Sequence, residues 1–129
     1  EDGVKLIWHA FDDMVGGEIY VKKIPSMKVT DIATAVSSEA KQIIVGIRPG
    51  EKLHEQMIGV EDSYYTYEYD NYYKILPSIH NWSEDPLRIN NGKKVAEGFN
   101  YSSNTNTEWM NVENLEKWIK DNKAKIGKI

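Results

Sequence analysis

The stretch that decides the fold is Tyr64-Tyr65-Thr66-Tyr67-Glu68-Tyr69-Asp70-Asn71-Tyr72-Tyr73-Lys74-Ile75-Leu76. It holds six of the chain's eight tyrosines, in two runs that Asp70-Asn71 separates. In the first run tyrosines alternate with polar residues, which is the period of two that a β-strand requires. Two such runs around a short polar turn predict an antiparallel hairpin. The rings could form a platform for sugars, but such alternation more often packs one face of a sheet.

A helix and a strand are predicted at the start of the chain. Apolar residues recur at helical spacing from Val4 to Val15, with Asp2 as a cap and Gly16-Gly17 as a stop. A short strand follows at 19–21 and ends before Pro25.

A second helix and a buried strand are predicted next. Residues 26–29 form a loop, and Thr30 or Asp31 caps the helix that follows it. Its inward-facing residues are Ile32, Ala33 and Val36. The run at 42–47, Gln-Ile-Ile-Val-Gly-Ile, is short, apolar and β-branched, so we interpret it as a buried strand.

The last third of the chain is predicted to be a long loop and a helix. Residues 77–107 are rich in Pro, Asn, Ser and Thr, which indicates loop with at most one short strand. Asn111 caps a final amphipathic helix. Its apolar face carries Val112, Leu115, Trp118 and Ile119. The prediction is a mixed α/β fold (α+β in isolation), with short strands, a tyrosine-rich hairpin and three main helices in one domain, 1–129.

The composition limits the classes of function. A chain of 129 residues suits one domain, and its 40% hydrophobic and 28% charged content is that of a soluble globular protein. No apolar run is long enough for a membrane span or a signal peptide. There is no cysteine, and the net charge of −4 has the wrong sign for a nucleic-acid surface. We therefore expect a cytoplasmic protein that binds neither nucleic acid nor membranes.

Three signatures of catalysis or cofactor binding fail. A phosphate loop needs four residues between its glycines, but only three separate Gly46 from Gly50. The run at 54–58 has one histidine where a helical zinc motif needs two. Neither Gly-x-Gly-x-x-Gly nor Tyr-x-x-x-Lys occurs, so both parts of a nicotinamide oxidoreductase signature are missing. We expect no catalytic residue, no cofactor-binding residue and no metal ligand in this chain.

One segment, 46–55, retains chemical interest. Arg48 follows the predicted strand, Pro49 fixes φ, Gly50 permits a sharp turn, and Glu51 follows. This order places a guanidinium beside a carboxylate at the carboxyl end of a strand, where open α/β folds bind ligands. The guanidinium suits a phosphate, and the carboxylate suits the two hydroxyls of a ribose. The alternative is a structural salt bridge within the turn.

A lysine-bearing loop, 22–28, follows the first predicted strand. It could supply a second wall of a binding site. The alternative is a solvated basic loop.

The chain resembles a known enzyme family at several motifs. The segments 16–21, 24–33 and 45–55 closely resemble the carboxyl-terminal region of the UDP-N-acetylglucosamine 4,6-dehydratases (inverting, 5-epimerising), which are extended short-chain dehydrogenase/reductases. Similar segments are 70–77, 97–106 and 108–110. One departure is Lys22, where the family usually has proline.

The resemblance implies a division of labour. The family's Rossmann domain, which carries NADP and the catalytic residues, is expected to lie before Glu1, so this chain is the substrate-binding part and is inactive alone. The resemblance implies that Arg48 grips the UDP diphosphate, that Glu51 accepts from ribose hydroxyls, and that Met27 and Lys28 line the nucleotide end.

The expected partners are the UDP-sugar, the chain's own Rossmann domain and further copies in a homo-oligomer. Severed from that domain, the chain should expose an apolar face. The rival interpretation is a stand-alone carbohydrate-binding or oligomerisation module, which uses the tyrosine hairpin and the 77–107 loop as its surface.

Overall fold

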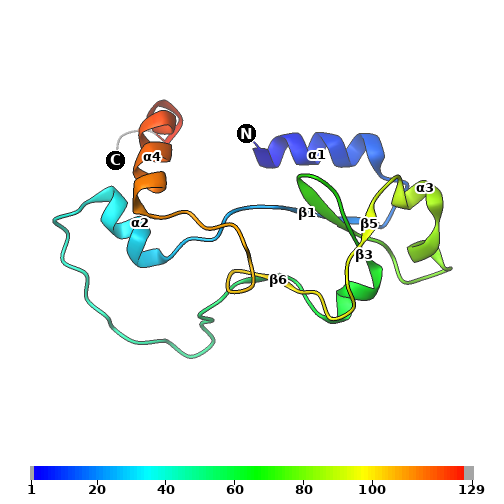
Figure 1. Cartoon of the computed structure of the whole chain (residues 1–129), viewed down its shortest axis with the longest axis horizontal. Coiled ribbons are helices and arrows are strands. Elements are labelled where there is room, and N and C mark those ends of the chain that lie inside the picture. The colour runs from blue at the N-terminus through cyan, green and yellow to red at the C-terminus, as the bar shows by residue number, and fades with distance from the viewer. Residues whose placement is uncertain (1, 127–129) are drawn as a thin grey trace. The chain divides into compact units, whose positions relative to one another are not determined.

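The computed structural model describes residues 2–126, which form two compact units. The first unit comprises residues 2–24 and 56–102, and the second comprises residues 25–55 and 103–126 (Figure 1). The fold class of mixed helices and strands is confirmed, and the single domain 1–129 stays a prediction. No helix within residues 2–126 has the length and apolar character that a membrane crossing needs.

A four-stranded antiparallel sheet forms the first unit, in the order β1-β4-β3-β5. Its strands are β1 (Ile19–Lys22), β3 (Thr66–Glu68), β4 (Tyr72–Ile75) and β5 (Lys93–Lys94). The predicted tyrosine hairpin is confirmed as β3 and β4, in which Thr66 pairs with Ile75 and Glu68 with Tyr73. A separate pair of strands is β2 (Gln56–Ile58) and β6 (Tyr101–Ser102), with an irregularity between Gln56 and Ile58.

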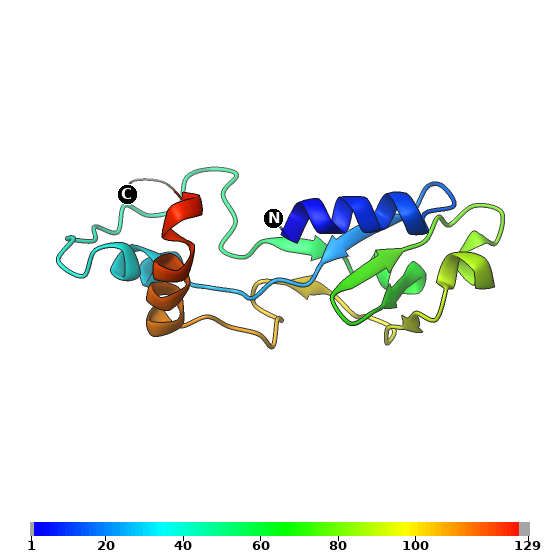
Figure 2. The ribbon, with the colours of Figure 1, turned by 90° about the horizontal axis from the view of Figure 1, so that it is seen from above.

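The predicted first helix is confirmed as α1 (Asp2–Asp13), which contacts β1 and runs beside it (Figure 2). Its inner side meets the sheet through His9, whose Nε2 lies 2.9 Å from the Tyr72 hydroxyl. Its outer side leaves Val4, Ile7, Trp8 and Phe11 more than half exposed.

The core of the first unit lies on the other face of the sheet. It consists of Val21, Ile58, Tyr73 and Tyr101, with Ile75, Val95 and Phe99 packed against them. The Tyr101 hydroxyl donates to the Ile24 carbonyl and accepts from the Ile24 N–H, both at 2.8 Å. Because Tyr73 is buried here and Tyr72 faces α1, the hairpin tyrosines serve both faces of the sheet.

Two helices form the second unit, α2 (Val29–Val36) and α4 (Val112–Ile126), and they pack on each other. The predicted cap of α4 is confirmed, because the Asn111 side chain accepts from the Asn114 N–H at 2.9 Å. The predicted cap of α2 is wrong: the helix begins after Lys28, whose carbonyl accepts from the N–H groups of Asp31 and Ile32. Of the residues expected to face inward on α2, Ile32 and Ala33 are half-buried and Val36 is exposed.

The predicted buried strand at 42–47 is wrong. The run has no regular secondary structure, and Ile44 and Val45 are 96% and 89% exposed. A strand is stable only where a neighbouring strand accepts its backbone hydrogen bonds, and no strand within residues 2–126 pairs with this run.

The region 77–107 is more ordered than the predicted loop. It contains η2 (Trp82–Glu84), α3 (Pro86–Ile89), β5 and β6, and also supplies part of the core. The short helix α3 begins where the Asp85 side chain accepts from the Leu87 N–H at 3.0 Å, with Pro86 in the first turn. Asn90 and Asn91 then adopt positive φ, which ends the helix and leads into β5.

Candidate functional site

Arg48 and Glu51 meet across a tight turn in the second unit. Pro49 occupies the second position, Gly50 the third with φ of +86°, and the Glu51 N–H donates to the Arg48 carbonyl at 3.1 Å. Proline followed by a residue with positive φ is the pattern of a type II turn. The predicted turn is therefore confirmed, although no strand precedes it.

The two side chains form an ion pair inside this turn. Arg48 Nε and Nη2 lie 2.7 and 2.6 Å from Glu51 Oε1, and Oε2 accepts from the Arg48 N–H at 2.8 Å. These hydrogen bonds, from the Arg48 backbone and then its side chain, lower the pKa of Glu51. The pair is exposed, with 85% of the Arg48 side chain and 40% of the Glu51 side chain accessible.

The exposed geometry leaves both side chains with unused bonding capacity. Glu51 accepts three contacts, and a carboxylate offers about four acceptor positions. Arg48 uses Nε and Nη2 in the ion pair, and 85% of its side chain is exposed. The arrangement fits a salt bridge that only stabilises the turn. It fits equally well a preformed binding site for a phosphate and for hydroxyl groups.

Met27 and Lys28 lie at the start of α2, and both are exposed. Their position is fixed by Ser26, which is buried and pairs with the segment before α4: its N–H donates to the Glu108 carbonyl at 2.8 Å, and its carbonyl accepts from Met110 at 2.9 Å. No hydrogen bond or ion pair within residues 2–126 joins Met27 or Lys28 to Arg48 or Glu51. The structure thus brings together one pair of the predicted site residues and not the other.

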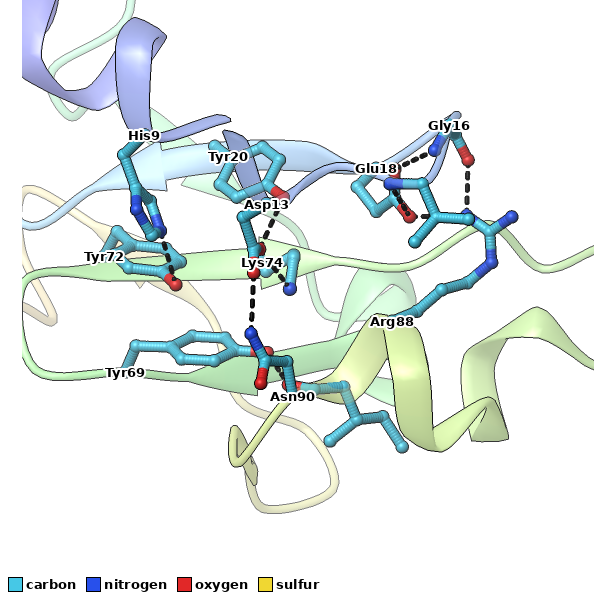
Figure 3. A network of polar contacts seen from close by, with 12 residues as sticks. His9, Asp13, Gly16, Glu18, Tyr20, Tyr69, Tyr72, Lys74, Arg88 and Asn90 are labelled. Carbon is cyan, nitrogen blue, oxygen red and sulfur yellow. Dashed lines mark hydrogen bonds and ion pairs between the residues drawn. The ribbon is translucent and has the colours of Figure 1, made fainter. Parts of the chain in front are cut away.

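A buried polar network in the first unit was missed by the sequence prediction. Lys74 on β4 is 1% exposed, and its Nζ lies 2.6 Å from Asp13 Oδ2 at the end of α1 (Figure 3). The same carboxylate accepts from the Tyr20 hydroxyl at 2.7 Å and from the Asn90 amide at 2.8 Å. Residues of α1, β1 and β4 and the residue that ends α3 therefore meet at the Asp13 carboxylate.

This network changes the acidity of its members. Burial raises the pKa of Asp13, but the hydrogen bonds from Lys74, Asn90 and Tyr20 and the charge of Lys74 outweigh it and lower the pKa to about 2. Burial and the charge of Asp13 raise the pKa of Tyr72 to about 12. At neutral pH the network therefore holds one carboxylate and neutral phenols.

We expect the stability of the first unit to fall in acid because of Asp13. Its folded pKa of about 2 lies below the ordinary value of 3.8 for an aspartate, so the stabilisation is complete above pH 3.8 and is lost as the pH falls to about 2. This shift corresponds to about 2 kcal/mol. Urea unfolding at a series of pH values measures how the free energy of unfolding depends on pH. Asp13→Asn should remove most of this dependence between pH 3.8 and about 2. An equal dependence in the Asn variant would contradict the assignment.

A second buried pair links α3 to the turn before β1. Arg88 Nη1 donates to a Glu18 carboxylate oxygen and, at 2.5 Å, to the Gly16 carbonyl (Figure 3). The guanidinium also lies over the Trp82 ring, 4.0 Å from its centroid. Burial raises the pKa of Glu18, but backbone N–H groups and Arg88 outweigh this and lower it.

The sequence held only weak signals for these two pairs. Asp13 and Lys74 are 61 residues apart, and Glu18 and Arg88 are 70 apart, so no local spacing connects them. The one usable signal was Lys74 itself, because alternation in the hairpin places it on the same face as Tyr72. No group of three or more acidic or histidine side chains in the described part of the chain is placed to hold a metal ion.

Comparisons with known proteins agree with the resemblance inferred from the motifs. A family described as "Polysaccharide biosynthesis protein" matches residues 1–77. The UDP-N-acetylglucosamine 4,6-dehydratase (inverting) of Campylobacter jejuni is 49% identical over 120 residues, which is 89% of this chain and 36% of that protein. The resemblance is thereby confirmed, and the chain spans about a third of the length of the curated relatives it matches.

This chain also matches about a third of the length of more distant relatives. The UDP-glucose 4-epimerase of Rickettsia akari is 30% identical over 122 residues, which is 92% of this chain and 36% of that protein. The X-ray structure of Pen from Bacillus thuringiensis matches with a TM-score of 0.75 at 21% identity, over 95% of this chain and 36% of that chain. The structural likeness concerns the fold alone.

Proposed function

This chain belongs to the polysaccharide biosynthesis protein family, and we propose that it is the UDP-sugar-binding part of an NADP-dependent UDP-N-acetylglucosamine 4,6-dehydratase. The observation that carries the proposal is the 49% identity, over 120 residues, to an inverting enzyme of that name. The share of 36% of that relative's length leaves room for a separate cofactor-binding part.

NADP does not fit the residues of this chain. Dinucleotide sites are built on parallel βαβ units with a glycine-rich first turn. Every pair of named strands within residues 2–126 is antiparallel, and Gly-x-Gly-x-x-Gly is absent from the sequence. We therefore assign the cofactor, and every step that depends on it, to the rest of the enzyme, and we expect no keto product from this chain alone.

The role of this chain is then to hold and orient the substrate. Arg48 offers its exposed guanidinium to the diphosphate, because a planar fork binds phosphate oxygens in pairs. Glu51 keeps acceptor capacity for the ribose hydroxyls and, with its lowered pKa, is ionised at neutral pH. Met27 and Lys28 are proposed to line the nucleotide end. Binding energy at these positions places the sugar for the reaction without touching the reacting atoms.

Two exposed apolar features support a missing partner domain. One is the outer side of α1 with Trp8 and Phe11, and the other is the unpaired run 43–47. Apolar side chains exposed in this number mark interaction surfaces. We propose that the enzyme's own dinucleotide-binding domain covers them, that the enzyme is a homo-oligomer, and that it acts in the cytoplasm.

We expect UDP to bind this chain and Arg48→Ala to weaken the binding by about 10- to 100-fold, the effect of losing hydrogen bonds to a charged group. Arg48→Lys should recover only part of the loss, because an ammonium cannot bind in a forked geometry. Isothermal titration calorimetry with UDP measures both effects.

The matched control is Lys52→Ala, which removes a neighbouring exposed cation from the same segment. It should leave UDP binding nearly unchanged. Tight binding of free N-acetylglucosamine without UDP binding would favour the carbohydrate-binding module. An equal loss in the Arg48 and Lys52 variants would contradict a specific role for Arg48.

A further inference from the structure

A basic hollow lies in the first unit, where α1 passes the end of the hairpin. Its volume is about 920 Å³, and α1, the end of β1, the hairpin turn and the segment before β5 line it. This volume lies within the range of small-molecule sites. All of its lining belongs to the first unit, so it shares no residue with the Arg48–Glu51 turn.

Positive charge dominates the lining although the chain is acidic overall. Four lysines line the hollow against two carboxylates, whereas the net charge of the chain is −4. One carboxylate, Glu68, is already bound to Lys23 at 2.7 Å, so it neutralises that lysine. No carboxylate of residues 2–126 forms an ion pair with Lys22 or Lys93. An excess of positive charge in a hollow attracts anionic ligands.

Two lysines, Lys5 on α1 and Lys22 on β1, line the hollow near the tyrosines. Lys5 and His9 are four residues apart on α1 and therefore lie on one face of the helix. Lys22 pairs in register with Tyr72 on β4, so both side chains lie on the sheet face that meets α1. Lys5 also contacts Asp2 at 3.6 Å, an exposed pair that costs little to rearrange.

The remaining lining suits a sugar ring. The rings of Tyr69 and Tyr72 stack with centroids 4.5 Å apart, and Leu6 adds apolar surface. The amides of Asn71 and Asn91 can each donate to and accept from hydroxyls. Aromatic surface beside amides and ammoniums is the chemistry that recognises a sugar with an anionic group.

We propose that this hollow is a second ligand site, which binds a sugar phosphate. Lys22 and Lys5 contact the phosphate oxygens, and the tyrosine pair with the two asparagines contacts the sugar.

The test is calorimetric titration of the chain carrying Arg48→Ala, so that the proposed UDP site does not contribute. We expect glucose 1-phosphate to bind this variant as tightly as the unmodified chain. Adding Lys22→Gln should weaken binding about tenfold, as expected for loss of a contact to a charged group. Lys94→Gln, an exposed lysine outside the hollow, is the matched control and should change little.

Two further ligands separate the sugar from the phosphate. Inorganic phosphate and free glucose should each bind the Arg48→Ala variant more weakly than glucose 1-phosphate. The proposal is overturned if glucose 1-phosphate does not bind, if Lys22→Gln and Lys94→Gln weaken binding equally, or if either half of the ligand binds as tightly as the whole. Circular dichroism is used to check that the Lys22→Gln variant remains folded.

Discussion

Lys74→Met should lower the free energy of unfolding of the first unit by about 3–5 kcal/mol, the usual cost of removing one partner from a buried ion pair. The Lys74 and Asp13 side chains are 1% and 8% exposed, so water cannot replace the lost ammonium. The Lys74 ammonium also lies over the rings of Tyr20 and Tyr69, 5.6 and 5.1 Å from their centroids. Urea unfolding followed by circular dichroism measures the effect.

The control for Lys74 is Lys94→Met, an exposed lysine on β5, which should change stability by less than about 0.5 kcal/mol. The double variant Asp13→Leu/Lys74→Met should be more stable than Lys74→Met alone, because it leaves no unpaired buried charge. A loss of the same size in the Lys94 variant, or none in the Lys74 variant, would refute the importance of this pair.

Arg88→Met should also lower the free energy of unfolding of the first unit by about 3–5 kcal/mol, because it leaves the Glu18 carboxylate buried without its cation. Arg88 is 5% exposed, and it joins the Glu18 carboxylate, the Gly16 carbonyl and the Trp82 ring. The Gly16 and Val15 N–H groups still donate to Glu18 at 2.7 and 3.3 Å, so the carboxylate keeps part of its support.

Arg88→Lys distinguishes charge from geometry at this site. Lysine keeps the positive charge but lacks the planar guanidinium that lies over the Trp82 ring, so we expect a loss of stability between that of Arg88→Met and none. Urea unfolding followed by circular dichroism measures the stability of both variants. If Arg88→Lys were as damaging as Arg88→Met, the charge would contribute nothing and this account of the pair would fail.

The elements that the sequence predicts well are those whose pattern is local. The tyrosine hairpin and α1 each repeat a clear period, and a polar turn or a glycine pair marks their limits. The turn at Arg48–Glu51 is equally local, because proline and glycine restrict four consecutive residues. These three features follow from neighbouring residues alone.

The sequence predictions are wrong or incomplete where contacts between residues far apart in the sequence determine the structure. The run 42–47 has the composition of a buried strand, but a strand needs a partner, and none within residues 2–126 pairs with it. The Asp13–Lys74 pair depends on α1 and β4 meeting across 61 residues. The 77–107 region gains its order from packing, as Val95, Phe99 and Tyr101 join the core.

The central claim, that the Arg48–Glu51 turn holds UDP, is tested most directly by locating UDP on the chain. Backbone amide spectra of ¹⁵N-labelled chain would be recorded while UDP is added. We predict saturable shifts at the amides of Gly46, Arg48, Gly50 and Glu51, and in Arg48→Ala we expect the remaining shifts to saturate only at about 10- to 100-fold higher UDP concentration. Saturable shifts confined to the hairpin at 64–76, or no shift in the turn at saturating UDP, would contradict the claim.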